Sequence, residues 1–233
     1  MIKNIKIEVC CGSVEDCLIA QQYHADRIEL NSALELGGLT PSLGELQLAK
    51  KKVNLPIVCM IRPRTAGFNY SETQFETMYL DAQILLKNGA DGIVFGFLNQ
   101  DDTIDLKRTK KMVELAHQYQ KEAVFHKAFD QCKDLDQALK DCIDCGIDRI
   151  LTSGGAAYPH ILKGAKNIQK WNLEKQNQIE LLPGGGVRKE NIKELLEISK
   201  AVQVHMTAKQ VFDDKGNYTA VDRITLKEIL ENI

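Results

Sequence analysis

The sequence lacks the long apolar runs that a membrane helix or a secretion signal requires. No stretch approaches the roughly 18 consecutive apolar residues of a membrane span, and residues 1–11 carry charges every few positions instead of an apolar core. It also lacks a strong excess of either charge, because 30 Lys and Arg stand against 32 Asp and Glu. We therefore expect a cytoplasmic protein that binds neither membranes nor nucleic acid.

The cysteines do not form the pattern of a disulfide framework. There are seven, an odd number, scattered along 233 residues, whereas secreted disulfide scaffolds are short chains with paired cysteines. We expect reduced thiols. Cys142 and Cys145 match a C-x-x-C motif, but no second ligand pair accompanies them and they lie at the predicted C-terminus of a helix. We interpret this pair as core packing.

No Pro- or Ser-rich linker and no low-complexity segment interrupts the chain, which favours a single domain over residues 1–233. Short β-branched or apolar runs alternate with longer segments of helical period. These runs begin near Ile5, Asp26, Pro56, Asp91, Glu122, Asp148, Ile179 and Ala201. Eight βα units of this size predict an α/β fold in which the strands close into a (β/α)8 TIM barrel, rather than an open doubly wound sheet. The C-terminal ends of the strands would then form the functional face.

Local signals mark the ends of several predicted helices. Ser71 followed by Gln74 is a capping box, and Gly89 supplies a stop after the apolar face that follows. Thr40 before Pro41 predicts a second helix start.

Alternation along the strands predicts which polar side chains face the barrel interior. The apolar residues of the first strand share one face, which leaves Glu8 and Cys10 inside. The same alternation places inside Arg27, Glu29, Asn31, Arg62, His126, Gln203 and His205. We interpret Arg27, in the middle of its strand, as part of a buried charge network. Near the strand ends, buried polar groups without a function would reduce stability, so we predict functional roles for Glu8, Glu29, His126 and His205.

Two glycine-rich segments follow the sixth and seventh predicted strands. Their glycines are Gly154, Gly155, Gly184, Gly185 and Gly186. We expect the second segment to lead directly into a helix and both to offer backbone N–H groups to an anion, with Arg62 and Arg64 closing over it. The alternative is that the glycines only permit tight turns.

The motifs together resemble the CutC copper homeostasis family. They are Glu-Val-Cys at 8–10, Ala-Asp-Arg-Ile-Glu-Leu at 25–30, Gly-Gly-Leu-Thr-Pro-Ser at 37–42, Met-Ile-Arg-Pro-Arg at 60–64, Phe-His-Lys-Ala-Phe-Asp at 125–130, Ile-Leu-Thr-Ser-Gly at 150–154 and Pro-Gly-Gly-Gly-Val at 183–187. They occur in unbroken order. The resemblance implies a cytosolic (β/α)8 barrel, often oligomeric, linked to copper handling, and we expect a homo-oligomer with a dimer favoured.

The resemblance also implies copper binding through two cysteines. The first matches Cys10, whereas Asn31 stands in place of the second, and an amide is a poor ligand for Cu(I). An arginine of the family's Phe-His-Arg motif is replaced by Lys127, which keeps the charge but loses the bidentate fork.

Two functions therefore remain open, with a small anionic ligand or a metal ion as the expected partner. The first is copper binding, with Cys10 as the metal ligand and copper as the cofactor. The second is an enzyme that acts on a small phosphorylated or otherwise anionic metabolite, with a catalytic set of Glu8, Glu29, Arg62, His126, Asp130 and His205. No inward lysine stands at a strand end and no nucleophile elbow is present, which leaves proton transfer or metal-assisted chemistry.

Overall fold

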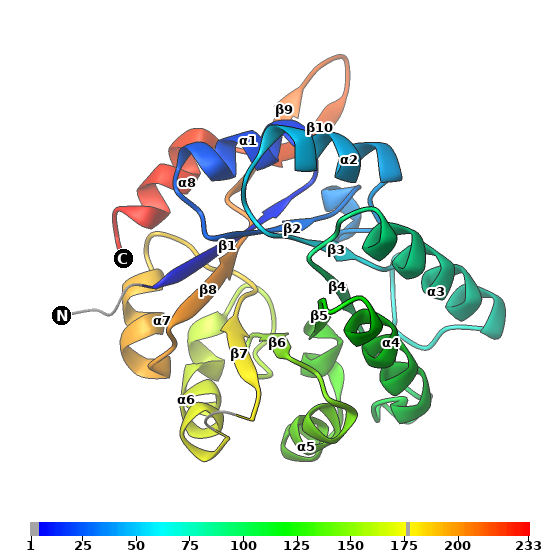
Figure 1. Cartoon of the computed structure of the whole chain (residues 1–233). Coiled ribbons are helices and arrows are strands. Elements are labelled where there is room, and N and C mark those ends of the chain that lie inside the picture. The colour runs from blue at the N-terminus through cyan, green and yellow to red at the C-terminus, as the bar shows by residue number, and fades with distance from the viewer. Residues whose placement is uncertain (1–4, 176–177) are drawn as a thin grey trace.

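The structure, a computed structural model, describes residues 5–175 and 178–233. Eight parallel strands form a nearly closed barrel in the order β7-β6-β5-β4-β3-β2-β1-β8, which confirms the predicted fold (Figure 1). The strands are β1 (Lys6–Cys11), β2 (Arg27–Leu30), β3 (Ile57–Met60), β4 (Gly92–Phe95), β5 (Glu122–Phe125), β6 (Arg149–Thr152), β7 (Glu180–Pro183) and β8 (Gln203–Met206). Each begins within two residues of its predicted start.

The last gap in the barrel lies between β7 and β8. These strands contact each other, but among the described residues no backbone ladder joins them. The side chain of Gln203 crosses the gap instead, because its Nε2 donates to the carbonyl of Leu181 at 3.3 Å. A side-chain hydrogen bond thus replaces part of the backbone hydrogen bonding between β7 and β8.

Helices surround the barrel, as Figure 1 shows. They are α1 (Val14–Gln22), α2 (Leu43–Lys52), α3 (Glu72–Lys87), α4 (Leu106–Gln118), α5 (Leu135–Cys145), α6 (Ala165–Glu174), α7 (Ile192–Ser199) and α8 (Arg223–Leu230), with short 3-10 helices η1 (Leu34–Leu36), η2 (Lys127–Gln131) and η3 (Ile161–Gly164). The main core lies between the outer faces of the strands and these helices. A smaller apolar layer of Val58, Met60, Val94 and Val124 fills the barrel interior.

One predicted helix start is confirmed and one is wrong. Ser71 and Gln74 form the expected capping box of α3. Helix α2 is capped by Ser42 rather than by Thr40. The Thr40 hydroxyl is engaged elsewhere, since it accepts from the backbone N–H of Arg62 at 2.9 Å and thereby ties this loop to the end of β3.

A hairpin of β9 (Lys209–Asp213) and β10 (Asn217–Val221) stands outside the barrel and was not predicted. It projects at the top of Figure 1. The rings of Phe212 and Tyr218 stack across its two strands with centroids 5.6 Å apart. The sequence does carry a signal for it, because aromatic and β-branched residues flank a turn that ends in Gly216.

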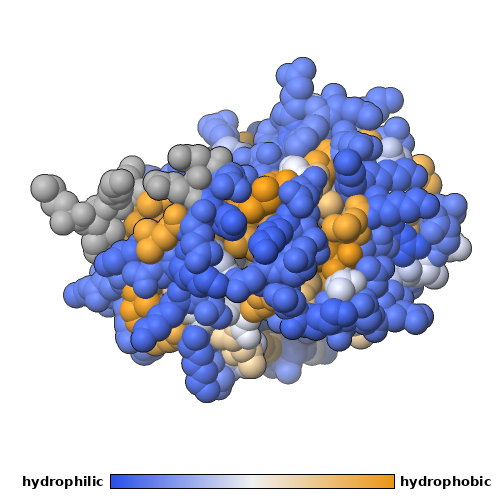
Figure 2. Space-filling view, turned by 90° about the horizontal axis from the view of Figure 1, so that it is seen from below, coloured by the Kyte–Doolittle hydropathy of each residue, from blue (hydrophilic) through white to orange (hydrophobic). Residues whose placement is uncertain are grey.

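Among the helices that the structure describes, none combines the length and the apolar character of a membrane span. The face seen in Figure 2 is mainly hydrophilic, and its apolar groups are gathered in small patches separated by polar ones.

Candidate functional site

A cavity of about 250 Å³ lies at the C-terminal ends of the barrel strands. Its polar lining comes from β1, β2 and β8 and from the segments that follow the strands, and includes Cys10, Glu29, Asn31, Arg62, His126, Lys127, Tyr158, Gly185, Gly186, His205, Thr207 and Lys209. Its apolar lining includes Leu34, Met60, Phe68 and Leu151. A cavity thus lies on the face of the barrel where the fold predicts the functional site.

Glu8 is buried beneath this cavity and does not line it. Its Oε2 accepts from Arg27 Nε, and its Oε1 lies 2.8 Å from His205 Nδ1. Burial raises the pKa of Glu8, but the hydrogen bond from His205 and the charge of Arg27 outweigh burial and hold the pKa at about 2. Glu8 is therefore a carboxylate that can only accept, and Arg27 belongs to a buried charge network as the sequence indicated.

His205 connects this network to the cavity. Burial lowers the pKa of His205, whereas the neighbouring carboxylates of Glu29 and Glu8 raise it, and the net result is a pKa above the usual value. Because Glu8 accepts at Nδ1, the other ring nitrogen, Nε2, is left for a partner in the cavity.

Cys10, Glu29 and His205 come together at the cavity wall. One ligand atom from each lies within 4.8 Å of the others, and all three residues are buried. The amide of Asn31 lies between two of them: its Nδ2 donates to Glu29 Oε2 at 2.9 Å and lies 3.3 Å from Cys10 Sγ. The other carboxylate oxygen of Glu29, Oε1, has no hydrogen-bond partner within the part of the chain that the structure describes.

Both acidic groups of this trio resist ionisation. Burial raises the pKa of Glu29, and the nearby charge of Glu8 raises it further. Burial also raises the pKa of the Cys10 thiol well above its usual value, with the charge of Glu29 adding to the effect. A bound cation would favour the ionised forms of both groups and so oppose this effect.

His126 faces the same cavity as a neutral hydrogen-bond donor. Its Nδ1 accepts from the backbone N–H of Ala128 at 3.1 Å, which places the ring proton on Nε2. That Nε2 is buried and has no partner among the described residues. Burial and the charge of Arg62 lower the pKa of His126 to about 3, so the ring stays neutral at physiological pH.

Arg62 supports this side of the cavity. Its guanidinium donates to the carbonyls of Gly37, at 3.0 Å, and Gly38, at 3.2 Å. It also lies over the ring of Phe68, 5.3 Å from the centroid. Its Nε is buried and, among the described atoms, without a partner. Arg62 thus reaches the cavity as predicted, while holding the loop after β2 in place.

Two cavity lysines were missed by strand alternation. Lys127 Nζ donates to Asp130 Oδ2 at 2.7 Å and to Ser153 Oγ at 2.8 Å. Helix η2 begins at Lys127, so the alternation of β5 no longer applies there. Lys209 begins β9 and donates to the carbonyl of Leu34 at 3.2 Å. The replacement of a motif arginine by Lys127 was the available signal for the first of these lysines.

The glycine segments differ from what the sequence predicted. The N–H groups of Gly154, Gly155 and Gly184 are bound inside the protein, by Thr152 Oγ1, Asp130 Oδ1 and the Thr152 carbonyl. These three glycines lie outside the cavity lining, so of the five predicted glycines it includes Gly185 and Gly186 alone. The expectation of a helix directly after Gly186 is wrong, because α7 begins at Ile192.

Arg64 and Asp130 also lie outside the cavity lining. The Arg64 guanidinium donates to loop carbonyls, including that of Asn69 at 2.8 Å, and lies over the ring of Tyr70. The carboxylate of Asp130 accepts from Lys127 and from the segment that follows β6. Asp130 therefore positions Lys127 instead of contacting a ligand.

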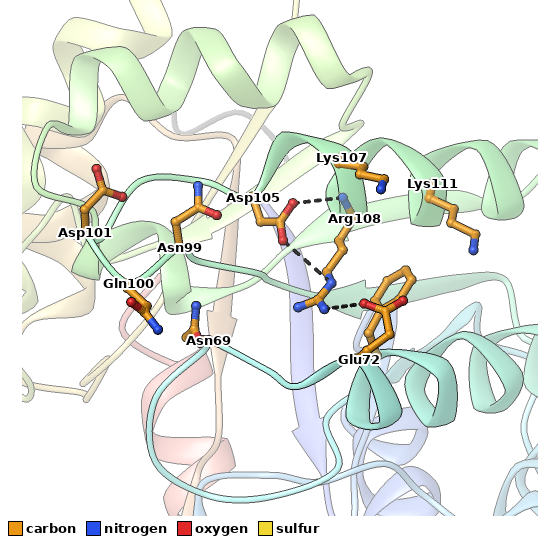
Figure 3. A pocket seen from close by; sticks show the side chains of 10 residues that line it. Asn69, Glu72, Asn99, Gln100, Asp101, Asp105, Lys107, Arg108 and Lys111 are labelled. Carbon is orange, nitrogen blue, oxygen red and sulfur yellow. Dashed lines mark hydrogen bonds and ion pairs between the residues drawn. The ribbon is translucent and has the colours of Figure 1, made fainter.

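A second hollow, of about 700 Å³, lies at the surface between the start of α3 and the loop before α4 (Figure 3). Its central cation is Arg108, which bonds Glu72 at 2.7 Å and the Tyr70 carbonyl at 2.6 Å, with Asp105 3.7 Å away. These partners satisfy the guanidinium within the fold. We therefore take the barrel mouth as the candidate functional site.

Comparison with known proteins shows the family of the chain. The model of the CutC family matches residues 5–210. A CutC family protein from Treponema denticola is 46% identical over 207 residues, covering 89% of this chain and 82% of the relative. The human copper homeostasis protein cutC homolog is 38% identical over 207 residues, covering 89% of this chain and 74% of the relative.

A solved structure gives the same result. The copper homeostasis protein CutC from Streptococcus agalactiae superposes with a TM-score of 0.79 at 28% identity, covering 86% of this chain and 97% of the other. Sequence and fold thus agree, and the chain belongs to the CutC family.

Proposed function

We propose that this chain binds a copper ion as its cargo at the barrel mouth, with Cys10, His205 and Glu29 as the ligands. The observation that carries this proposal is the approach of their three ligand atoms to within 4.8 Å in a buried site. Thiolate and imidazole are both ligands that suit copper. The name of the human relative, a copper homeostasis protein, supports the choice of ion.

The side chains around the trio support this assignment. Metal-binding histidines usually donate their second ring N–H to a carboxylate, which fixes the ring and increases its basicity. In this chain, Glu8 Oε1 is the carboxylate oxygen that accepts from His205 Nδ1, at 2.8 Å. Asn31 holds the Glu29 carboxylate and contacts the Cys10 sulfur. Each ligand is therefore oriented by a partner, which lowers the entropy lost on binding.

Protons compete with the ion at these ligands. Burial and neighbouring charge raise the pKa values of Cys10 and Glu29, and the two carboxylates raise that of His205. The three ligand atoms bind a cation in their deprotonated forms, so affinity rises with pH.

Competition with a chromogenic Cu(I) chelator under reducing conditions tests this proposal. We expect Cys10→Ser to weaken Cu(I) binding by at least about tenfold, whereas Cys142→Ser, a buried thiol of α5, leaves it unchanged. Equal affinities of wild type and Cys10→Ser would contradict the assignment, as would loss of binding in Cys142→Ser.

Acid–base catalysis on a small anionic metabolite is a second candidate function. It is favoured by one observation: Glu29, whose pKa burial raises, and His126, whose pKa of about 3 keeps it a neutral donor, face one cavity. A carboxyl of raised pKa suits proton transfer, and a neutral imidazole N–H suits a developing oxyanion. Hydrogen–deuterium exchange at carbon in candidate metabolites, lost in Glu29→Gln, would support it, and no exchange with wild type would contradict it.

A further inference from the structure

We propose that Lys127, Gly185, Gly186, Arg62 and His126 form a binding site for a small organic phosphate in the same cavity. This goes beyond copper binding, because none of these residues belongs to the trio of proposed ligands. Four features carry it: the charge of the lining, the cradle around Lys127, the unpartnered donors and the size of the cavity.

The cavity lining is rich in positive charge. Arg62, Lys127 and Lys209 line it together with His205, whereas Glu29 is the one carboxylate among its described lining residues. Glu8 and Asp130 lie behind the lining, each bound to a cation. A concave site walled by apolar side chains concentrates the field of such cations, so an anion is favoured over a neutral or cationic ligand.

Lys127 and the loop after β7 form a cradle for one anionic group. An ammonium has three N–H donors, and the fold uses two of those of Lys127, on Asp130 and Ser153. Gly185 lets the ammonium lie against the backbone, because a Cβ there would be 2.7 Å from Lys127 Nζ. Among the described residues, the N–H groups of Gly185 and Gly186 have no hydrogen-bond partner. In many barrels a phosphate binds to N–H groups of the loops after strands seven and eight.

Two residues that line the cavity each carry a further donor without a partner. His126 Nε2 and Arg62 Nε are buried, and neither has a partner within the described part of the chain. His126 is only 4% exposed. Leaving a buried donor unpaired costs about 1–3 kcal/mol, so a ligand that offers oxygen acceptors here is stabilised. Since the pKa of His126 is about 3, its ring donates one N–H to such an oxygen and carries no charge.

The size and the apolar lining define the rest of the ligand. A volume of about 250 Å³ holds roughly eight groups of the size of water, at about 30 Å³ each. Met60, Phe68 and Leu151 supply contacts for carbon atoms. The class that fits is a phosphate ester of a short hydroxylated or carbonyl-bearing carbon chain.

Calorimetry on the full chain, with a chelator present so that metal binding plays no part, tests the proposal. The probes are inorganic phosphate, glycerol phosphate, ribose 5-phosphate and malate. We expect an organic phosphate to bind more tightly than inorganic phosphate or malate. Lys127→Met should weaken binding at least tenfold. Lys170→Met should leave binding unchanged, because Lys170 is an exposed lysine of α6 that does not line the cavity.

Two further variants test whether the charge of Lys127 and the N–H of His126 contribute to phosphate binding. Lys127→Arg, which keeps the charge, should retain binding, and His126→Phe should weaken it if Lys127→Met does not fold. No binding of any phosphate below about 10 mM, equal binding by wild type and Lys127→Met, or tighter binding of malate would overturn it. Cu(I) affinity of Lys127→Met should match wild type, so failure here is distinguishable from failure of the copper site.

Discussion

Glu8 and His205, from the neighbouring strands β1 and β8, are joined by a hydrogen bond of 2.8 Å between Oε1 and Nδ1. The bond lies under the cavity and fixes the ring so that Nε2 faces the proposed ion. The same carboxylate binds Arg27. Glu8, expected from the sequence to act directly, thus has a positioning role in the proposed site.

Replacing Glu8 with Gln should destabilise the fold. The substitution keeps the size of the side chain but leaves the buried charge of Arg27 without a counter-ion. Breaking a buried ion pair from one side costs about 3–5 kcal/mol. Urea denaturation should show this loss. Glu72→Gln, on the exposed side of the surface pair with Arg108, should change stability far less, because solvent screens that pair. Equal effects of the two substitutions would contradict the buried network.

Acid should unfold the protein partly through Glu8. Its pKa in the folded state, about 2, lies below the usual 4.5, so the unfolded chain binds the proton more readily. The stabilisation is therefore complete above pH 4.5 and is lost as the pH falls towards 2. Urea midpoints measured across this range should fall more steeply in wild type than in Glu8→Gln.

His126 should remain neutral far below the usual pKa of histidine. Its folded pKa of about 3 lies below the usual 6.5, so stability from this residue is present above pH 6.5 and is lost as the pH falls towards 3. In nitrogen NMR spectra we expect a neutral ring with the proton on Nε2 at pH 5. A charged ring at pH 5, or a proton on Nδ1, would contradict the donor role.

Replacing Asn31 with Cys should tighten Cu(I) binding. The Asn31 amide lies 3.3 Å from Cys10 Sγ, so a thiol at this position places a second soft ligand beside the first. Asn31→Ser is the matched control, since it also removes the hydrogen bond to Glu29 but adds no sulfur. Equal Cu(I) affinities of the Cys and Ser variants would argue against copper binding at Cys10.

The barrel and much of its mouth were predictable from sequence. Alternation along short strands gave the correct inward side for Glu29 and His205 because the strand period of two is rigid. It also held for Arg62 and His126, which lie just past the ends of β3 and β5. It failed where the backbone turns away from the strand direction. The turn of η2 brings Lys127 into the cavity, and the capture of loop N–H groups by Asp130 depends on contacts distant in sequence.

X-ray absorption spectroscopy of the Cu(I)-loaded protein tests the central claim most directly, because it counts the sulfur and the nitrogen or oxygen neighbours of the ion. The account predicts one sulfur ligand together with nitrogen or oxygen ligands, and loss of the sulfur in Cys10→Ser. Two or more sulfur ligands in wild type, or an unchanged sulfur ligand in Cys10→Ser, would place the copper away from the trio of Cys10, Glu29 and His205.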